Sequence, residues 1–62
     1  MKAHLVDIEC TIKHSTEKAV LVNDGRIDAW LPKNQIEIDH GSHGKTVTVT
    51  LPEWLAIDKE LI

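Results

Sequence analysis

The chain has few aromatic residues and no excess of basic charge, and both shortages argue against nucleic-acid binding. Two Trp residues are its whole aromatic content, because Tyr and Phe are absent. Proteins that bind single-stranded nucleic acid by stacking, and grooves that hold proline-rich peptides, need several exposed rings. Seven Lys and Arg residues against ten Asp and Glu residues give a formal net charge of −3. This balance supplies no basic stripe for phosphates, so direct binding to nucleic acid is not expected.

The chain also has a single cysteine and no long hydrophobic run. A lone cysteine forms no internal disulfide, so the fold does not depend on an oxidising compartment. Residues 1–7 lack the apolar run of a signal peptide, and no stretch has the ~20 apolar residues that cross a bilayer. The sequence contains neither a phosphate-binding glycine loop nor a nucleophile elbow. We therefore expect a cytoplasmic protein without a membrane partner, a cofactor or an enzyme activity.

The length predicts one small domain over residues 1–62, close to the lower limit for a chain that folds without disulfides or metals. Hydrophobic residues make up 42% of the sequence, which is typical of a globular chain and argues against disorder. Because so small a core only just balances the entropy of ordering the chain, a homodimer stays open as an alternative.

Alternation of apolar and polar residues predicts five short strands. The clearest turn is Asn23-Asp24-Gly25, because these residues tolerate the positive φ values of a hairpin turn and apolar runs flank them. Pro32 cannot donate a hydrogen bond to a neighbouring strand, so a strand ends there. The predicted strands span 6–13, 19–22, 27–31, 35–39 and 45–51.

A helix closes the chain in this prediction. Pro52 and Glu53 suit its first turn, and we expect a length of about ten residues. At about 100° per residue, the apolar arc of this helix comprises Trp54, Leu55, Ile57, Leu61 and Ile62. Trp54 is expected in the core, and Ala56, Lys59 and Glu60 are expected to face away from it. The expected fold is therefore β-rich α+β, with five short, mostly antiparallel strands as a twisted sheet or a small partly open barrel and one C-terminal helix.

One set of residues has the chemistry of zinc ligands, because thiolate sulfur and imidazole nitrogen both bind zinc. The set comprises Cys10, His14, His40 and His43. Cys10, however, continues the inward-facing row of the first strand, where a small buried hydrophobe is expected. The last two histidines lie in a glycine-containing loop, where solvated side chains are the ordinary finding. The sequence predicts no metal site and leaves this set as its only candidate.

Acidic residues recur on the outward-facing rows of the first and fourth strands, at Asp7, Glu9, Glu37 and Asp39. If these strands lie near one another, the four side chains form an acidic patch with few basic residues between them. Such a patch favours encounter with a basic surface, including the Lys/Arg-rich groove of a nucleic-acid-binding protein. The alternative is a solvated face that only keeps the protein soluble.

Trp30 shares the face of Asp28 rather than that of the apolar row of its strand. An exposed Trp at this position would be a typical anchor for a protein partner. The alternative is that the C-terminal helix or a closing barrel covers it. The candidate partner-binding residues are thus Asp7, Glu9, Asp28, Trp30, Glu37 and Asp39.

Three segments carry a resemblance to known proteins. Residues 18–25 read KAVLVNDG, residues 29–37 read AWLPKNQIE and residues 49–56 read VTLPEWLA. They resemble a widespread group of short phage- and prophage-encoded proteins with a KAVLV-x-DG hairpin, a W-hydrophobic-PKSQI segment and a hydrophobic-PEWLA helix start. This sequence departs at Asn34, where that group has Ser. The resemblance implies a mobile-element origin in a bacterial host, where very small acidic proteins, anti-CRISPR proteins among them, inhibit host systems stoichiometrically.

Our leading hypothesis is therefore a non-catalytic phage-type inhibitor or modulator, anti-CRISPR or other anti-defence, that binds a host protein through the acidic strand face. A basic nucleic-acid-handling complex is the expected partner class. The first alternative is a nucleic-acid-associated accessory module, whose binding would depend on Lys13, Lys18, Arg26, Lys33 and Lys45. The second is a homo-oligomeric structural subunit.

Overall fold

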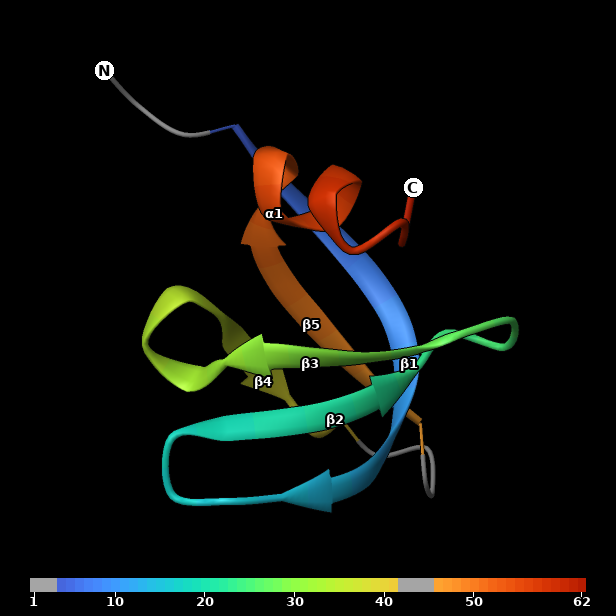
Figure 1. Ribbon diagram of the computed structural model, residues 1–62, viewed down its shortest axis with the longest axis vertical. Helices are drawn as coiled ribbons and strands as arrows, with labels where there is room; N and C mark the ends of the chain where they lie inside the picture. Colours follow the sequence, from blue (N-terminus) through green and yellow to red (C-terminus); the bar gives the residue numbers. More distant parts are fainter. Residues whose placement is uncertain (1–3, 42–45) are drawn as a thin grey trace.

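In the computed structural model, which describes residues 4–41 and 46–62, the chain forms one antiparallel sheet followed by a short helix (Figure 1). The strand order is β3-β2-β1-β5-β4, and every pairing is antiparallel. The expected β-rich α+β fold is confirmed, and the sheet is not closed into a barrel, so β3 and β4 are its two edges. The elements are β1 (Leu5–Ser15), β2 (Ala19–Asn23), β3 (Asp28–Pro32), the 3-10 turn η1 (Lys33–Gln35), β4 (Glu37–Asp39), β5 (Thr46–Pro52) and α1 (Glu53–Asp58).

The long strand β1 joins the two halves of the sheet. Its first part pairs with β5, from Leu5 opposite Pro52 to Thr11 opposite Thr46. Its last part pairs with β2, and the register shifts by a bulge between Ile12 and His14. A bulge bends a strand and increases its twist. Figure 1 shows the result, with the β2–β3 hairpin running across the direction of β1 and β5.

This bend places the inner faces of both halves around one core. The largest fully buried side chains come from β2, β3 and β5, and they are Val20, Val22, Leu31, Val49 and Leu51. The alternation predicted for the first strand is confirmed as far as the bulge, because Cys10 is buried and Ile8 and Ile12 pack against the core. The pattern of inward and outward residues in the strands was therefore readable from the sequence.

The predicted fourth strand is shorter than expected. Residues 35–39 alternate in polarity, but only 37–39 pair with β5, and Gln35 ends the 3-10 turn. Pro32, at the end of β3, has the extended conformation that caps this turn. The backbone thus leaves one edge of the sheet at Pro32 and enters the other edge at Glu37.

The hairpin predicted around Asn23-Asp24-Gly25 is confirmed. Gly25 has a φ of 103°, which favours glycine. The Asp24 carboxylate accepts hydrogen bonds from the backbone N–H groups of Arg26 at 2.9 Å and of Ile27 at 3.0 Å. These two donors, with that of Ile27 the larger cause, hold the pKa of Asp24 below its ordinary value. The loop is therefore organised by the side chain of a turn residue.

The C-terminal helix corrects three predictions. It has six residues, Glu53–Asp58, instead of about ten. Trp54 was expected in the core but is 56% exposed, and Ile57 is 57% exposed. Ala56 was expected to face away but is fully buried. Of the predicted apolar arc, Leu55 and Leu61 are buried as expected, whereas Trp54, Ile57 and Ile62 are exposed.

The physical reason lies in the two ends of the helix. At its start the Glu53 N–H donates to the His4 carbonyl at 2.6 Å, which fixes the direction in which the chain leaves β5. At its end Glu60 has a φ of 62°, and the Leu61 N–H donates to the Ala56 carbonyl at 2.8 Å. This is a Schellman motif, in which the chain reverses and the residue after the reversal packs back on the helix. Leu61 reaches the core by this reversal.

Candidate binding surface

The four acidic residues of the first and fourth strands lie in two rows on the outer face of the sheet. The register places Asp7 opposite Thr50 and Thr50 opposite Glu37. In the next row Glu9 is opposite Thr48 and Thr48 opposite Asp39. The acidic patch was expected only if the first and fourth strands lie near one another. In the structure β5 lies between β1 and β4, so the two acids of each row are separated by two strand spacings, or roughly 10 Å. We call Asp7, Glu9, Glu37 and Asp39 the acidic face.

The carboxylates of the acidic face are exposed, and no cation of residues 4–41 and 46–62 forms an ion pair with them. All four residues are exposed. In the described part of the chain the two ion pairs join Lys13 to Asp28 and Arg26 to Asp24, and neither includes a residue of the acidic face. Within the described residues two hydrogen bonds reach these carboxylates: the Thr50 hydroxyl donates to Asp7 at 2.6 Å, and the Gly41 N–H donates to Asp39 at 2.9 Å. The face therefore has a net negative field and free acceptor oxygens.

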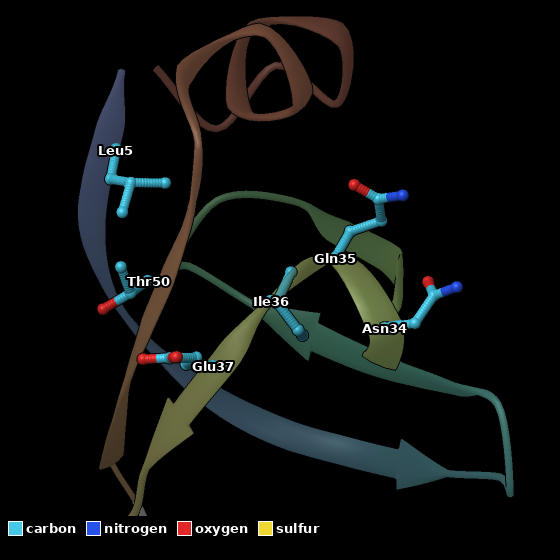
Figure 2. A pocket seen from close by; sticks show the side chains of 6 residues that line it. All are labelled: Leu5, Asn34, Gln35, Ile36, Glu37 and Thr50. Atoms are coloured by element: carbon cyan, nitrogen blue, oxygen red, sulfur yellow. The ribbon is translucent and has the colours of Figure 1, made fainter. Parts of the chain in front are cut away.

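A shallow pocket of about 250 Å³ continues the acidic face toward the N-terminal end of β1 (Figure 2). Its side chains come from β1, β5 and the segment from η1 to β4, with Leu5 and Thr50 on one side and Asn34 and Gln35 on the other. Leu5 is 58% exposed, so an apolar surface lies next to the carboxylates. The lining residues are Leu5, Asn34, Gln35, Ile36, Glu37 and Thr50.

Asp28 and Trp30, the other two candidates, lie on β3, which β2 and β1 separate from β5. Asp28 accepts a hydrogen bond from the Asn23 amide at 2.7 Å and pairs with Lys13 at 3.6 Å. Trp30 is 45% exposed, and its ring meets the His14 ring edge to face, with centroids 5.9 Å apart. The structure thus divides the six predicted residues into a group of four and a separate pair.

The structure does not bring the predicted zinc ligands together. Cys10 lies on the inner face, opposite Val47, whereas His14 follows the bulge and lies on the outer face, opposite Leu21. Burial, and to a smaller extent the Asp24 charge, raises the pKa of the Cys10 thiol. His40 is exposed beyond β4, and His43 falls outside the described residues. Within residues 4–41 and 46–62 no group of three His, Cys, Asp or Glu side chains is placed to hold a metal ion.

The basic residues of the nucleic-acid alternative are dispersed. Lys13 and Arg26 are in ion pairs, and Arg26 also donates to the Glu60 carbonyl at 3.1 Å. Lys18 and Lys33 line a second hollow of about 480 Å³, which Glu17 also lines. Lys45 falls outside the described residues. The four of these five residues that the structure describes are thus divided between two ion pairs and a hollow shared with Glu17.

Sequence reasoning missed the threonines between the acids and the exposed Leu5. The alternation of Val with Thr in 46–51 already places Thr48 and Thr50 on the outer face, so this signal was present. What the sequence does not contain is the register that sets each threonine between two carboxylates.

Comparison of the chain with protein-family models, with curated proteins and with solved structures gives no match. Within the described residues, no helix has the length and apolar character that a membrane-spanning segment requires.

Proposed function

We propose that this chain is a non-catalytic binding protein whose acidic face docks on a basic surface of a host protein. The observation that carries the proposal is the alignment of four exposed carboxylates in two rows across β1, β5 and β4. No Lys or Arg side chain of the described residues neutralises them. Such a field accelerates encounter with a positive surface and disfavours negative partners.

The strands make this surface rigid, which lowers the entropy lost on binding. Along one strand the two acids are two residues apart, or roughly 7 Å, and across the rows they are roughly 10 Å apart. A partner that satisfies all four therefore has several Lys or Arg side chains on one side of a groove. Grooves that hold nucleic-acid phosphates have this chemistry, because they are built to neutralise closely spaced negative charges. Inhibition of a host defence complex, as by anti-CRISPR proteins, is the form of this function that we propose.

The test compares two variants that remove the same number of charges. The face variant is Asp7→Asn, Glu9→Gln, Glu37→Gln and Asp39→Asn; the amide at position 7 keeps an acceptor for Thr50. The control variant is Glu17→Gln, Glu53→Gln, Asp58→Asn and Glu60→Gln, which changes residues outside the two rows. Both are immobilised beside the original chain, and a bacterial lysate with active defence complexes is passed over them after nuclease treatment. Bound proteins are identified and quantified by mass spectrometry.

We expect to identify a host protein that binds the original chain in a stoichiometric amount. The control variant should retain this protein, and the face variant should lose it. Its binding should weaken as salt rises, because salt screens exposed charges. Equal retention by the face variant would refute a role for the acidic face. A partner that disappears with nuclease would instead favour the nucleic-acid accessory module, which a titration against single- and double-stranded oligonucleotides then tests directly.

A further inference from the structure

The edge strand β3 has backbone groups that do not pair with β2, and the β2–β3 register shows which of them point toward the free edge. At one end of the β2–β3 ladder the Lys33 N–H donates to the Lys18 carbonyl, and at the other the Asp24 N–H donates to the Ile27 carbonyl. In an antiparallel ladder, hydrogen-bonded and non-hydrogen-bonded pairs alternate. The pair of Leu21 with Trp30 is therefore a non-hydrogen-bonded one. The backbone N–H and C=O of Trp30 point away from β2.

The same alternation applies to Asp28 and Pro32, which are two residues from Trp30 in either direction. Their backbone groups also point toward the free edge, and Pro32 has no N–H there. Among the backbone hydrogen bonds of the described residues, none outside the ladder involves Asp28 or Trp30. The edge thus offers donors at Asp28 and Trp30 and a carbonyl at Pro32, a short segment that another strand can pair with.

We infer that this edge pairs with the same edge of a second copy of the chain, antiparallel and with a two-fold axis through Trp30. In this arrangement the backbone N–H of Trp30 in each copy donates to the backbone carbonyl of Trp30 in the other. The N–H of Asp28 donates to the carbonyl of Pro32 in the other copy. A two-fold axis normal to the sheet places the outer faces of both copies on the same side of the joined sheet. The two exposed indole rings, which lie on this face, therefore become direct cross-strand neighbours.

The backbone groups and charges of this edge suit a second copy. The antiparallel pairing sets the Asp28 N–H of one copy opposite the Pro32 carbonyl of the other, and no like charges stand directly opposite each other. The other edge behaves differently, because self-pairing of β4 about Ile38 would place Glu37 opposite Asp39. Like charges directly opposite each other destabilise a strand pair. The charges therefore oppose self-pairing at β4 and permit it at β3, where pairing about a two-fold axis gives a closed dimer.

The dimer is expected to be weak. A five-residue edge with one large aromatic side chain buries much less than the ~800 Å² per partner of a standard interface. Pro32 also removes one donor from each end of the shared ladder. Association should therefore become visible at chain concentrations on the order of 0.1 mM and above. This interface is separate from the acidic face, so the failure of either proposal leaves the other standing.

Sedimentation equilibrium over a concentration series tests the dimer with a matched pair of variants. Trp30→Lys places like charges at the two-fold axis and should raise the dimer dissociation constant about tenfold or more. Trp54→Lys is the control, because Trp54 is also exposed but lies on α1. The original chain and the control should approach twice the 7.0 kDa of one chain as concentration rises, while Trp30→Lys stays near the single mass.

Backbone amide exchange followed by NMR gives a second readout that does not depend on substitution. Protection of the Asp28 and Trp30 amides should rise with chain concentration, because only a second strand covers them. The Ala29 and Leu31 amides, which face β2, should be protected at every concentration. A single mass at all concentrations, or a dimer that Trp54→Lys abolishes and Trp30→Lys does not, would overturn the inference. Concentration-independent exchange at Trp30 would overturn it as well.

Discussion

Replacing Glu60 by glycine is expected to stabilise the fold. Glu60 is exposed and has a φ of 62°, the left-handed conformation that closes the Schellman motif after α1. Its backbone makes the contacts that matter: the N–H donates to the Ile57 carbonyl at 3.0 Å, and the carbonyl accepts from Arg26 at 3.1 Å. Because the substitution changes no backbone atom, these hydrogen bonds persist in the variant.

The magnitude follows from two opposing effects. An L-residue in the left-handed region costs about 1–2 kcal/mol, which glycine avoids. Glycine in turn loses more chain entropy on folding, about 0.5–1 kcal/mol. Removing a negative charge near the C-terminal end of a helix adds about 0.3 kcal/mol in favour of the variant. The net gain in the free energy of unfolding is about 1 kcal/mol, which corresponds to a rise in Tm of about 4–8 °C for a domain of this size.

Urea and thermal unfolding, followed by Trp fluorescence and circular dichroism, measure this gain. Glu60→Ala is the control, because it removes the charge and keeps the β-carbon in the left-handed conformation. Because both variants remove the charge, the glycine variant should exceed the alanine variant by about 0.7 kcal/mol at an unchanged m-value. If the two variants are equally stable, or the glycine variant is weaker, the left-handed conformation at this position does not cost what the structure implies.

Three further predictions follow from buried or hydrogen-bonded side chains. Leu51→Ala should lower the free energy of unfolding by about 2–5 kcal/mol, because Leu51 is fully buried; a loss below 1 kcal/mol in urea unfolding would contradict its core position. Since the folded pKa of Asp24 is depressed, its stabilisation is present above the ordinary value of 3.8 and is lost as pH falls through the lower folded pKa. Asp24→Asn should therefore cost stability at neutral pH and progressively less in acid, whereas a pH-independent difference would exclude this linkage. Cys10 is 4% exposed, and burial raises the pKa of its thiol. It should therefore react with iodoacetamide on the order of 100-fold more slowly in the folded chain than in the urea-unfolded chain. Equal rates would show that the thiol is accessible in the folded chain.

The strand predictions succeeded because they depend on local patterns. A strand alternates its side chains with a period of two, so polar and apolar residues report the inner and outer rows directly. Cys10 and the acidic residues therefore lie on the faces that the pattern indicates. The hairpin was predictable for a similar reason, since Asn23, Asp24 and Gly25 form its turn through their own backbone preferences and side-chain hydrogen bonds.

The presence of the C-terminal helix was predicted correctly, but part of its buried face was wrong because periodicity gives an apolar arc and not the direction of the core. Trp54 and Ile57 are large and apolar yet exposed, whereas Leu55 and the small Ala56 face the core. The rotation of α1 is set by its attachment to β5 and by the reversal at Glu60, and neither depends on the size of the side chains. A short helix with two fixed ends buries the face that those ends direct inward.

By itself the sequence determined where strands and turns lie and which residues of each strand face outward, because these depend on neighbours within a few positions along the chain. Only the tertiary structure decided that β5 lies between the acids of β1 and β4 and that Trp30 lies on an open edge. Strand order and register arise from pairing between distant segments, which many alternative arrangements of the same patterns would satisfy. The packing of one shared core selects among them, so the arrangement of the acidic face became visible only with the fold.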